Sequence, residues 1–536
     1  MFSTIDLFAG AGGLSAGFEN SGQFKILAAV EKNENAKATY HKNFPVVKLY
    51  DDIQHVDFVK MQEELGRINV IIGGPPCQGF SNANRQNSNA LNQNNMMVKE
   101  YVRAIREIRP DAFVMENVGM LKSDVHYFFE TQKDYDDIEH YNVPMKVQRL
   151  FLIEKKYLSG SIDRFFNEAF VDSIMWNLKE FQVLYTIYRT RANSDKCYKR
   201  LNKHKHELML LVERLKNHRM KLPADICNYE NRVINAIQDF FNDNQSNVLR
   251  LILGIEPTIH FQKMLQTIRV ALSHHLIVRG YSEENDKYYL NIRACSVVDY
   301  IKNILESDEM GYQLTSGILK AEEFGVPQKR RRFVIIGVKR NIKSSDLHLP
   351  TGKYAGKRYF TVQEAIGDLA NESPVYDASE SLEGQDYQQI LPQSNPLLDY
   401  LRNGSQKLFN HLISKTGDIA MERFMAIEPG QNFHSLDPEL RVNTYTNTER
   451  TQNTIYLRLD PKQPSRTVLN VRKSMWIHPT KNRGVSVREA ARLQSFQDTF
   501  IFEGSKDSQF QQVGNAVPPL MARGIAEYLA SLLNKN

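Results

Sequence analysis

Apolar and polar positions follow two alternating periods over residues 1–122 of the chain. Short apolar runs predict strands, the stretches between them have helical spacing, and glycine or proline follows several of the runs. The predicted strands are Thr4–Phe8, Ile26–Glu31, Val46–Leu49, Asn69–Ile72 and Ala112–Met115. This order is typical of a doubly wound α/β sheet, in which ligands bind outside the carboxyl ends of the strands.

The pattern changes over residues 123–309, where strand signals fade and glycine becomes rare. Leu201, Leu208, Leu211 and Leu215 recur at helical spacing, so we expect a mainly helical insertion. The segment from Tyr188 to Lys221 holds 11 Lys and Arg residues against 3 Asp and Glu residues. That surplus is typical either of a solvated helix surface or of a contact with a nucleic-acid backbone.

Three further segments complete the pattern. Phe333–Val338 is predicted to be another strand, and residues 340–467 are polar, loop-rich and short of helical spacing. Val487–Leu533 is predicted to be helical and compact. No internal repeat and no low-complexity linker is visible.

Composition sets broad limits on the kind of protein. The 536 residues are 42% apolar, which is enough for a sizeable core and for roughly two to four domains. We find no apolar run of roughly 18 residues and no signal sequence, so neither a membrane span nor secretion is expected. Four scattered cysteines indicate a reducing, cytoplasmic compartment. The net charge of +6 permits a polyanionic partner without requiring one.

Polar motifs follow the first three predicted strands. The glycines of the block Asp6–Gly13 (DLFAGAGG) allow a tight turn and a close approach to a ligand. Glu31, at the end of the second strand, can bind the two hydroxyls of a ribose. Asp52 follows the third strand and can accept a hydrogen bond from an adenine amino group. Together these positions predict a cofactor that contains adenosine.

The fourth and fifth strands are followed by candidate catalytic groups. The block Gly73–Ser81 (GGPPCQGFS) delivers Cys77 into a loop beyond the sheet, where a thiol is a candidate nucleophile. Glu116, in the ENV block, is expected to face the same cleft, and an apolar pocket would raise its pKa and let it donate a proton. The three other cysteines lack such a loop and are expected to be small buried residues. They are Cys197, Cys227 and Cys295.

A basic block follows the insertion, at Gly325–Phe333 (GVPQKRRRF). Alternate residues of an extended segment face one side, so Gln328, Arg330 and Arg332 are expected to converge on one site. A basic patch at the start of a strand is the plainer interpretation. The sequence shows no cluster of metal ligands, and no metal is expected.

The ordered blocks resemble the DNA (cytosine-5)-methyltransferases of bacterial restriction–modification systems. The eight blocks are DLFAGAGG, Glu31, DDI, GGPPCQGFS, ENV, PQKRRR, REAARLQSF at Arg488–Phe496 and QVGNAVPP at Gln512–Pro519. The resemblance covers residues 1–122, 311–340 and 458–536. It implies the Rossmann-like sheet of class I S-adenosylmethionine-dependent methyltransferases, together with a smaller target-recognition domain.

The resemblance also implies a role for each block. The cofactor would be S-adenosylmethionine, and the substrate a cytosine flipped out of double-stranded DNA. Cys77 would attack C6, Glu116 would engage N3 and the exocyclic amine, Arg332 would contact O2, and Arg330 would support Cys77 and the pocket. The cofactor-binding residues would be Phe8, Gly10, Gly12, Glu31, Asp52, Ile53, Pro75, Asn515 and Val517, and the substrate-binding residues Gln78, Ser81, Gln328 and Thr467. Asp51 departs from the pattern, because the family more often has glycine there.

The same resemblance divides the chain into domains. Residues 1–122, 310–340 and 464–536 would form the catalytic domain, and residues 341–463 the target-recognition domain. Tyr445, Arg450 and Arg458 could each be a base reader, a phosphate contact or a surface residue. The insertion, residues 123–309, is far longer than the family's usual junction. We favour a helical accessory domain over a fused endonuclease, because no acidic cluster with a following Glu-x-Lys is visible. A monomer that acts beside a separately encoded endonuclease is expected.

Two alternatives remain open. An RNA cytosine-5 methyltransferase would use the same chemistry, although the Cys-Phe-Thr signature of the relatives that act on transfer RNA is absent. A catalytically silent DNA-binding relative should have lost Cys77 or Glu116, and both are present.

Overall fold

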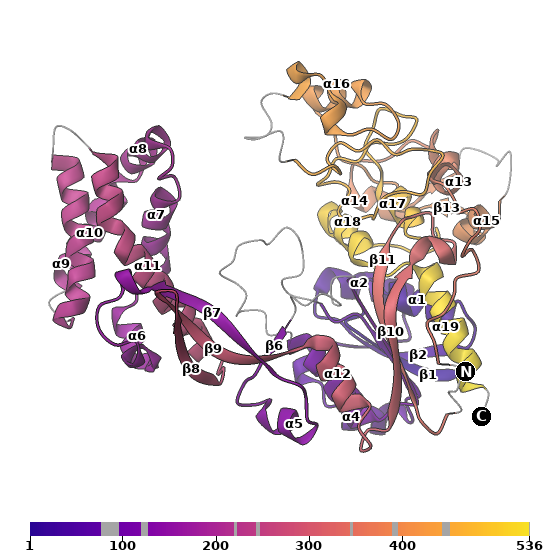
Figure 1. Cartoon of the computed structure of the whole chain (residues 1–536). Coiled ribbons are helices and arrows are strands. Elements are labelled where there is room, and N and C mark those ends of the chain that lie inside the picture. Colours follow the sequence, from indigo (N-terminus) through magenta and orange to yellow (C-terminus); the bar gives the residue numbers. More distant parts are fainter. Residues whose placement is uncertain are drawn as a thin grey trace. The chain divides into compact units, whose positions relative to one another are not determined.

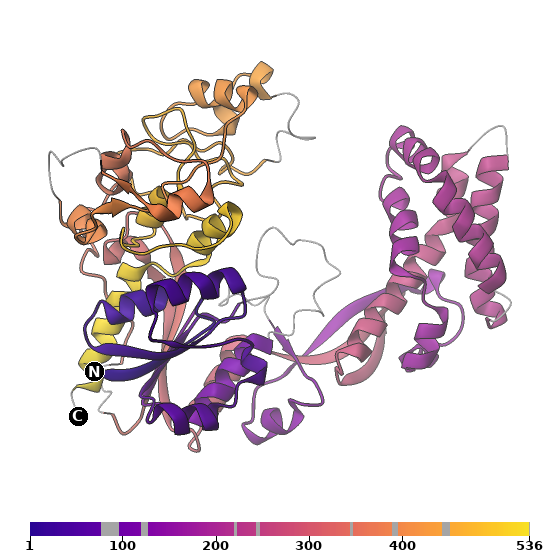
Figure 2. The same ribbon diagram turned by 180° about the vertical axis from the view of Figure 1, so that it is seen from behind.

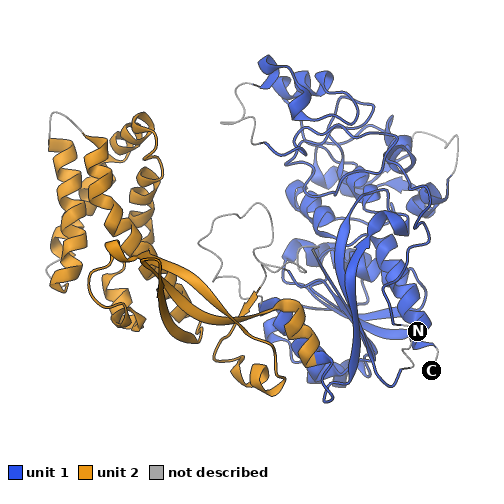
Figure 3. Ribbon diagram, viewed as in Figure 1, with its two compact units in different colours: residues 1–80, 95–123, 305–536 blue, residues 81–94, 124–304 orange. Residues whose placement is uncertain are grey.

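The computed structural model describes residues 1–76, 96–118, 127–218, 222–242, 247–342, 347–387, 395–441 and 451–534. The chain divides into two compact units, shown in Figure 3. Unit 1 comprises residues 1–80, 95–123 and 305–536, and unit 2 comprises residues 81–94 and 124–304. Among the helices of the described ranges, none is long and apolar enough to cross a membrane.

A seven-stranded sheet runs through unit 1 in the order β10-β11-β5-β4-β1-β2-β3 (Figure 1). Its strands are β1 (Phe2–Leu7), β2 (Phe24–Val30), β3 (Lys48–Tyr50), β4 (Val70–Gly73), β5 (Ala112–Val118), β10 (Tyr312–Lys320) and β11 (Arg331–Lys339). β11 is antiparallel to both of its neighbours, whereas β1 to β5 are parallel. The predicted class I sheet is confirmed. The six predicted strands are found within three residues of their expected ends, and β10 is an addition.

Helices cover both faces of this sheet (Figure 2). α1 (Gly13–Glu19), α2 (Glu34–Asn43) and α19 (Pro519–Leu533) lie on one face, and α3 (Phe58–Leu65) and α4 (Met96–Ile108) lie on the other. Right-handed crossovers explain this division, because β1, β2 and β3 step outward and the chain then returns past β1 to β4 and β5. The five parallel strands therefore present their carboxyl ends at one edge.

The rest of unit 1 is mainly loops and short helices, as the sequence pattern predicts. Residues 340–467 contain α13 (Val362–Ile366), α14 (Ala378–Glu383), α15 (Pro396–Arg402), α16 (Asp418–Ala426) and the two-residue strands β12 (Gln385–Asp386) and β13 (Lys407–Leu408). α17 (Val487–Leu493) and α18 (Lys506–Asn515) follow. α17 is buried along its whole length, and its Arg492 is paired with Asp498 and Asp368. These buried ion pairs join α17 to the loops around it.

Unit 2 is mainly helical, as expected. Its helices are α5 (Tyr135–His140), α6 (Glu168–Ile174), α7 (Leu178–Tyr188), α8 (Ser194–Lys203), α9 (Lys205–His218), α10 (Ala224–Asn242), α11 (Val248–Ser273) and most of α12 (Val297–Leu305). The four leucines that predict one helical face are all buried, but a break at His204 divides them between α8 and α9.

Unit 2 also contains an antiparallel sheet that the sequence pattern does not predict. Its strands are β6 (Tyr127–Phe129), β7 (Lys146–Glu154), β8 (Val278–Glu284) and β9 (Lys287–Ser296), with β6 and β7 flanking β9 and β8 paired to β9 as well. Val147 and Phe151 of β7 are exposed, on the face opposite to the buried Leu152. Apolar side chains on both faces obscure the alternation that marks a half-buried strand.

Candidate active site

A glycine turn begins the site, directly after β1. The backbone of Phe8, Gly10 and Gly12 has φ values of 61°, 55° and 96°, in the left-handed region that favours glycine. The amide of Gly10 donates to Glu31 Oε2 at 2.8 Å, and the amide of Asn33 donates to Glu31 Oε1 at 2.7 Å. A side chain added at Gly10 would meet no atom within 4 Å. The turn is therefore fixed to β2 and leaves open space above Gly10.

A buried acid that sequence reasoning left without a role supports this turn. Asp6 is fully buried at the end of β1 and accepts a hydrogen bond from Ser15 Oγ of α1 at 2.7 Å. Ser15 also shares a hydrogen bond of 2.6 Å with the Tyr40 hydroxyl of α2. Burial raises the pKa of Asp6 to about 7, against the effect of the Ser15 hydrogen bond. The signal in the sequence is an acid between Ile5 and Leu7, two apolar residues of a strand whose last four residues are buried.

Asp52 lies at the next strand end, where it caps a short helical turn. Its Oδ1 accepts from the amide of Gln54 at 3.1 Å, and its Oδ2 accepts from Lys32 Nζ at 2.6 Å. The Lys32 hydrogen bond holds the pKa of Asp52 below its usual value. Each carboxylate oxygen has a second lone pair, so Asp52 can accept a further hydrogen bond. Its neighbour Ile53 is almost fully buried in the core and offers a ligand little surface.

The C-terminal block folds back beside the glycine turn, as expected. A side chain added at Gly13 would lie 2.3 Å from the carbonyl oxygen of Val517, so the two backbones are in direct contact. Asn515 is exposed at the end of α18 and accepts from Gln511 Nε2 at 2.8 Å. Gln511 Oε1 in turn accepts from Asn470 Nδ2 at 3.2 Å. A chain of side-chain amides thus links the loop at residue 470 to Asn515.

Pro75 and Glu116 lie together where β4 and β5 end. A side chain added at Gly74 would lie 3.0 Å from Glu116 Oε2, and Asn117 Nδ2 donates to the carbonyl of Pro75 at 3.1 Å. The backbone that leads to Cys77 therefore runs directly past the Glu116 carboxylate. Cys77, Gln78 and Ser81 themselves lie outside the described residues, as do Tyr445 and Arg450.

Glu116 and Arg332 form a nearly buried ion pair. Arg332 Nε lies 2.5 Å from Glu116 Oε1, and both side chains are about one-tenth exposed. Burial raises the pKa of Glu116 above its usual value, although the guanidinium of Arg332 acts in the opposite direction. A carboxyl group with a raised pKa holds a proton more readily than a free glutamate does. The pair provides a proton or hydrogen-bond donor beside a cation.

Gln328 and Arg330 converge, as expected, but they do so inside the protein, where Gln328 has no exposed surface to offer a substrate. Gln328 is fully buried, donating to the Leu493 carbonyl and to Gln494 and accepting from the amide of Val468 at 2.7 Å. Arg330 is also fully buried and donates to the carbonyls of Val468, Gly514 and Ala516 at 2.8 to 3.1 Å. These hydrogen bonds tie both side chains to the surrounding backbone, although Arg330 Nε has no hydrogen-bond partner among the described residues. Both position the segment that contains Thr467 and the block that contains Asn515.

The structure also gives the surroundings of two further candidate residues, Thr467 and Arg458. Thr467 is partly exposed and its hydroxyl donates to the Lys329 carbonyl at 2.9 Å. Arg458 is buried and donates to the backbone carbonyls of Ile427 and His478. None of the three roles considered for Arg458 fits, because its guanidinium is enclosed by protein acceptors.

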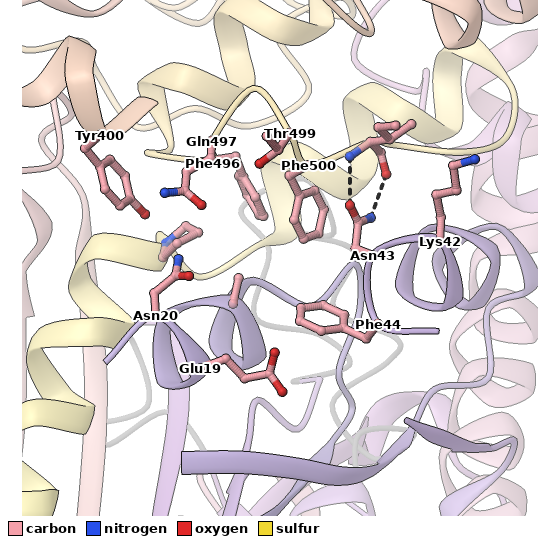
Figure 4. A pocket seen from close by; sticks show the side chains of 13 residues that line it. Glu19, Asn20, Lys42, Asn43, Phe44, Tyr400, Phe496, Gln497, Thr499 and Phe500 are labelled. Carbon is pink, nitrogen blue, oxygen red and sulfur yellow. Dashed lines mark hydrogen bonds between the residues drawn. The ribbon is translucent and has the colours of Figure 1, made fainter. Parts of the chain in front are cut away.

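A separate pocket of about 330 Å³ lies elsewhere in unit 1 (Figure 4). Glu19 and Asn20 at the end of α1, Lys42 to Phe44 at the end of α2, Tyr400 and the loop from Phe496 to Ile501 line it. None of the predicted site residues is among its walls. It lies at the opposite end of α1 from the glycine turn, so it is not the candidate active site.

Comparisons with known proteins agree with this geometry. The family profile described as C-5 cytosine-specific DNA methylase matches residues 2–151 and 284–531. The type II methyltransferase M.DdeI of Desulfomicrobium norvegicum is 36% identical over 43% of this chain, and the match spans 58% of that relative. M.AgeI of Thalassovita gelatinovora is 27% identical over 98% of both chains.

A solved structure supports the fold. A prophage-encoded protein assigned as a DNA modification methyltransferase (E. coli) matches over the full length of both chains, with a TM-score of 0.53 and 20% identity. The family profile covers well over half of the chain and includes every element of the sheet edge described above. The chain belongs to the C-5 cytosine-specific DNA methylase family.

Proposed function

We propose that this protein is a DNA (cytosine-5-)-methyltransferase that methylates a cytosine within a specific sequence of double-stranded DNA. The observation that carries the proposal is the buried Glu116–Arg332 pair, which lies against Gly74 three residues before Cys77. The glycine turn fixed to Glu31 lies at the ends of neighbouring strands of the same sheet. The arrangement supports a nucleophile, an acid and a cofactor site at one edge.

The residues around the glycine turn fit S-adenosylmethionine, the cofactor of the family. The open space above Gly10 accepts a ligand, the Glu31 carboxylate suits the ribose hydroxyls, and Asp52 suits the adenine amine. Phe8 and Pro75 would supply apolar walls, with Gly12, Asn515 and Val517 completing the pocket. Ile53, which is almost fully buried, would support the pocket from behind. When bound, the cofactor supplies an electrophilic methyl group.

The chemistry of the base rests on Cys77 and Glu116. C5 of cytosine is a poor nucleophile, and addition of the Cys77 thiolate to C6 makes C5 enamine-like and able to take a methyl group. Glu116 donates a hydrogen bond to N3 and accepts one from the exocyclic amine, which stabilises the charge that develops on the ring. Arg332 holds Glu116 and contacts O2. Loss of the C5 proton then expels Cys77 and restores the ring.

The target base must leave the duplex to reach Cys77, which costs a few kcal/mol. Thr467 would contact the flipped strand at the edge of the recognition region, residues 341–463. Gln78 and Ser81 would contact the substrate from the loop after Cys77. Arg330 and Gln328 act as positioning residues, because they hold the backbone on both sides of Val468.

The relatives support a biological setting for this activity. M.DdeI and M.AgeI are type II methyltransferases, so methylation by this protein would protect DNA from a separately encoded restriction endonuclease. We propose that it acts as a monomer in the cytoplasm.

Bisulfite sequencing of DNA from cells that express the protein tests this function. Methylated cytosines within one recurrent sequence are expected, and DNA without new 5-methylcytosine would reject the proposal. Cys77→Ser is the matched control. It should leave the DNA unmethylated and form no covalent adduct with 5-fluorocytosine DNA, whereas the unaltered protein should be trapped because fluorine replaces the C5 proton needed for release.

A further inference from the structure

The outer surface of α8 in unit 2 carries an unbroken row of lysines. Lys196, Lys199 and Lys203 are exposed and occupy positions i, i+3 and i+7, within about 60° around the helix axis. Cys197 and Leu201 on the opposite side are fully buried in the core that α8 shares with α7, α10 and α11. The lysine row therefore lies on the exposed face of a helix whose opposite face packs against the core of unit 2.

These lysines differ from several other basic residues of unit 2. Arg149, Lys155 and Lys156 each form an ion pair with a glutamate, and Arg164 and Arg269 pair with aspartates. Within the described part of the chain, no carboxylate lies within ion-pairing distance of Lys196, Lys199 or Lys203. Asp195 is the sole acid of α8. The row is a source of positive charge that the protein does not neutralise.

The neighbouring basic residues are already engaged. Arg200 is half-buried and donates to the Thr186 carbonyl at 2.7 Å, Arg191 lies over the Tyr188 ring, and Lys205 lies over the Phe241 ring. Only part of the basic segment recognised in the sequence is thus available to a partner. Among the described residues of that segment, the three lysines of α8 form a row along one exposed helix face.

We propose that this lysine row contacts the phosphate backbone of duplex DNA without reading its sequence. Lys196 and Lys203 are seven residues apart, so the row spans about 10 Å along the helix axis. Each strand of duplex DNA carries one phosphate per about 3.4 Å of the duplex axis, so the row matches the length of about three phosphates. Lysine binds phosphate as a point charge, and the row contains no Asn, Gln or Arg, the planar side chains that read base edges with paired hydrogen bonds. The family profile leaves residues 152–283 unmatched, so it assigns no role to this helix.

The inference rests on the proposed function, because it takes the substrate DNA as the partner. The test measures binding of the full chain to a labelled duplex of random sequence as the NaCl concentration rises. Each phosphate contact contributes about 0.9 to the slope of log affinity against log salt. Lys196→Gln/Lys199→Gln/Lys203→Gln should therefore lower that slope by roughly 2 to 3.

A matched control removes three positive charges from the same unit. Arg149→Gln/Lys155→Gln/Lys156→Gln changes the net charge equally, but its residues are already paired, so its slope should fall by less than about 1. Equal slopes for the lysine variant and the unaltered protein would overturn the inference, as would equal losses in both variants. Methyl transfer by the unaltered protein is measured separately, so a failure of the proposed function is distinguished from a failure of this contact.

Discussion

Three carboxyl groups near the edge of the sheet have different surroundings, and their pKa values differ accordingly. Asp6 is buried with one hydroxyl donor, and its pKa rises to about 7. Asp52 is bonded to Lys32, and its pKa falls. Glu116 is buried beside Arg332, and its pKa rises because burial outweighs the cation. Asp52 is thus suited to accept hydrogen bonds and Glu116 to donate one, as their proposed roles require.

Glu116→Gln tests the acid at the residue scale. Glutamine keeps the shape but cannot transfer a proton, so turnover should fall by roughly a hundredfold or more. Affinity for the cofactor should change little, since the proposed contact of Glu116 is with the base. Single-turnover methylation and equilibrium cofactor binding measure the two effects. A variant whose main defect is weak cofactor binding would contradict the assigned role.

Asp6 should make stability depend on pH. Its folded pKa of about 7 exceeds the ordinary value of 3.8, so between these values the folded chain keeps a proton that the unfolded chain has released. The free energy of unfolding therefore falls as pH rises from about 4 to about 7, by at most about 1.4 kcal/mol per unit. Asp6→Asn lacks this contribution. Thermal melts should show the unaltered protein losing stability relative to the variant between pH 5 and pH 8, and parallel curves would refute the shift.

At the scale of elements, α18 links the loop at Asn470 to Asn515, a residue of the proposed cofactor pocket. Asn470 donates to Gln511, which donates to Asn515 one helical turn further along α18. Gln511→Ala should raise the KM for S-adenosylmethionine about fivefold, the effect of one lost hydrogen bond of about 1 kcal/mol, with little change in kcat.

Combining Asn470→Ala with Gln511→Ala tests whether Asn470 and Gln511 affect cofactor binding through the same chain of hydrogen bonds. Because the two side chains act in series on Asn515, the double variant should raise KM no further than Gln511→Ala alone. Additive effects would show that Asn470 and Gln511 act on the cofactor independently.

The sheet, and the strand ends at which several candidate residues lie, could be predicted because their signals are local. Apolar runs followed by glycine locate β1, β4 and β5, and an acid at a strand end marks Glu31, Asp52 and Glu116. Alternation predicts that Gln328 and Arg330 share a side of their segment, but it does not show whether that side faces solvent. Their acceptors come from residues 468, 493, 494, 514 and 516, more than 130 positions away in the chain. No pattern within one segment reveals such contacts.

At the scale of the whole molecule, the family profile and the division into units agree on which residues are added to the part of the chain that matches the family. The profile omits residues 152–283, all of which belong to unit 2, whereas residues 341–463 belong to unit 1 with the sheet. Lys329, next to Arg330, shares a backbone hydrogen bond with Ser465 and accepts one from Thr467, so the segment that directly follows the recognition region is attached to the candidate site. Sequence specificity should therefore depend on residues 341–463, and the row on α8 should affect affinity alone.

Exchange of residues 341–463 for the equivalent region of a type II relative tests this separation. The chimera should methylate the relative's sequence, because the groups that act on the flipped cytosine remain unchanged while the surface that reads neighbouring base pairs is replaced. Bisulfite sequencing of DNA methylated by each protein identifies the site. The matched control replaces residues 152–283 with the corresponding segment of M.AgeI, and it should keep the original site while changing the salt dependence of binding. An active first chimera that still methylates the original sequence would place specificity elsewhere in the chain.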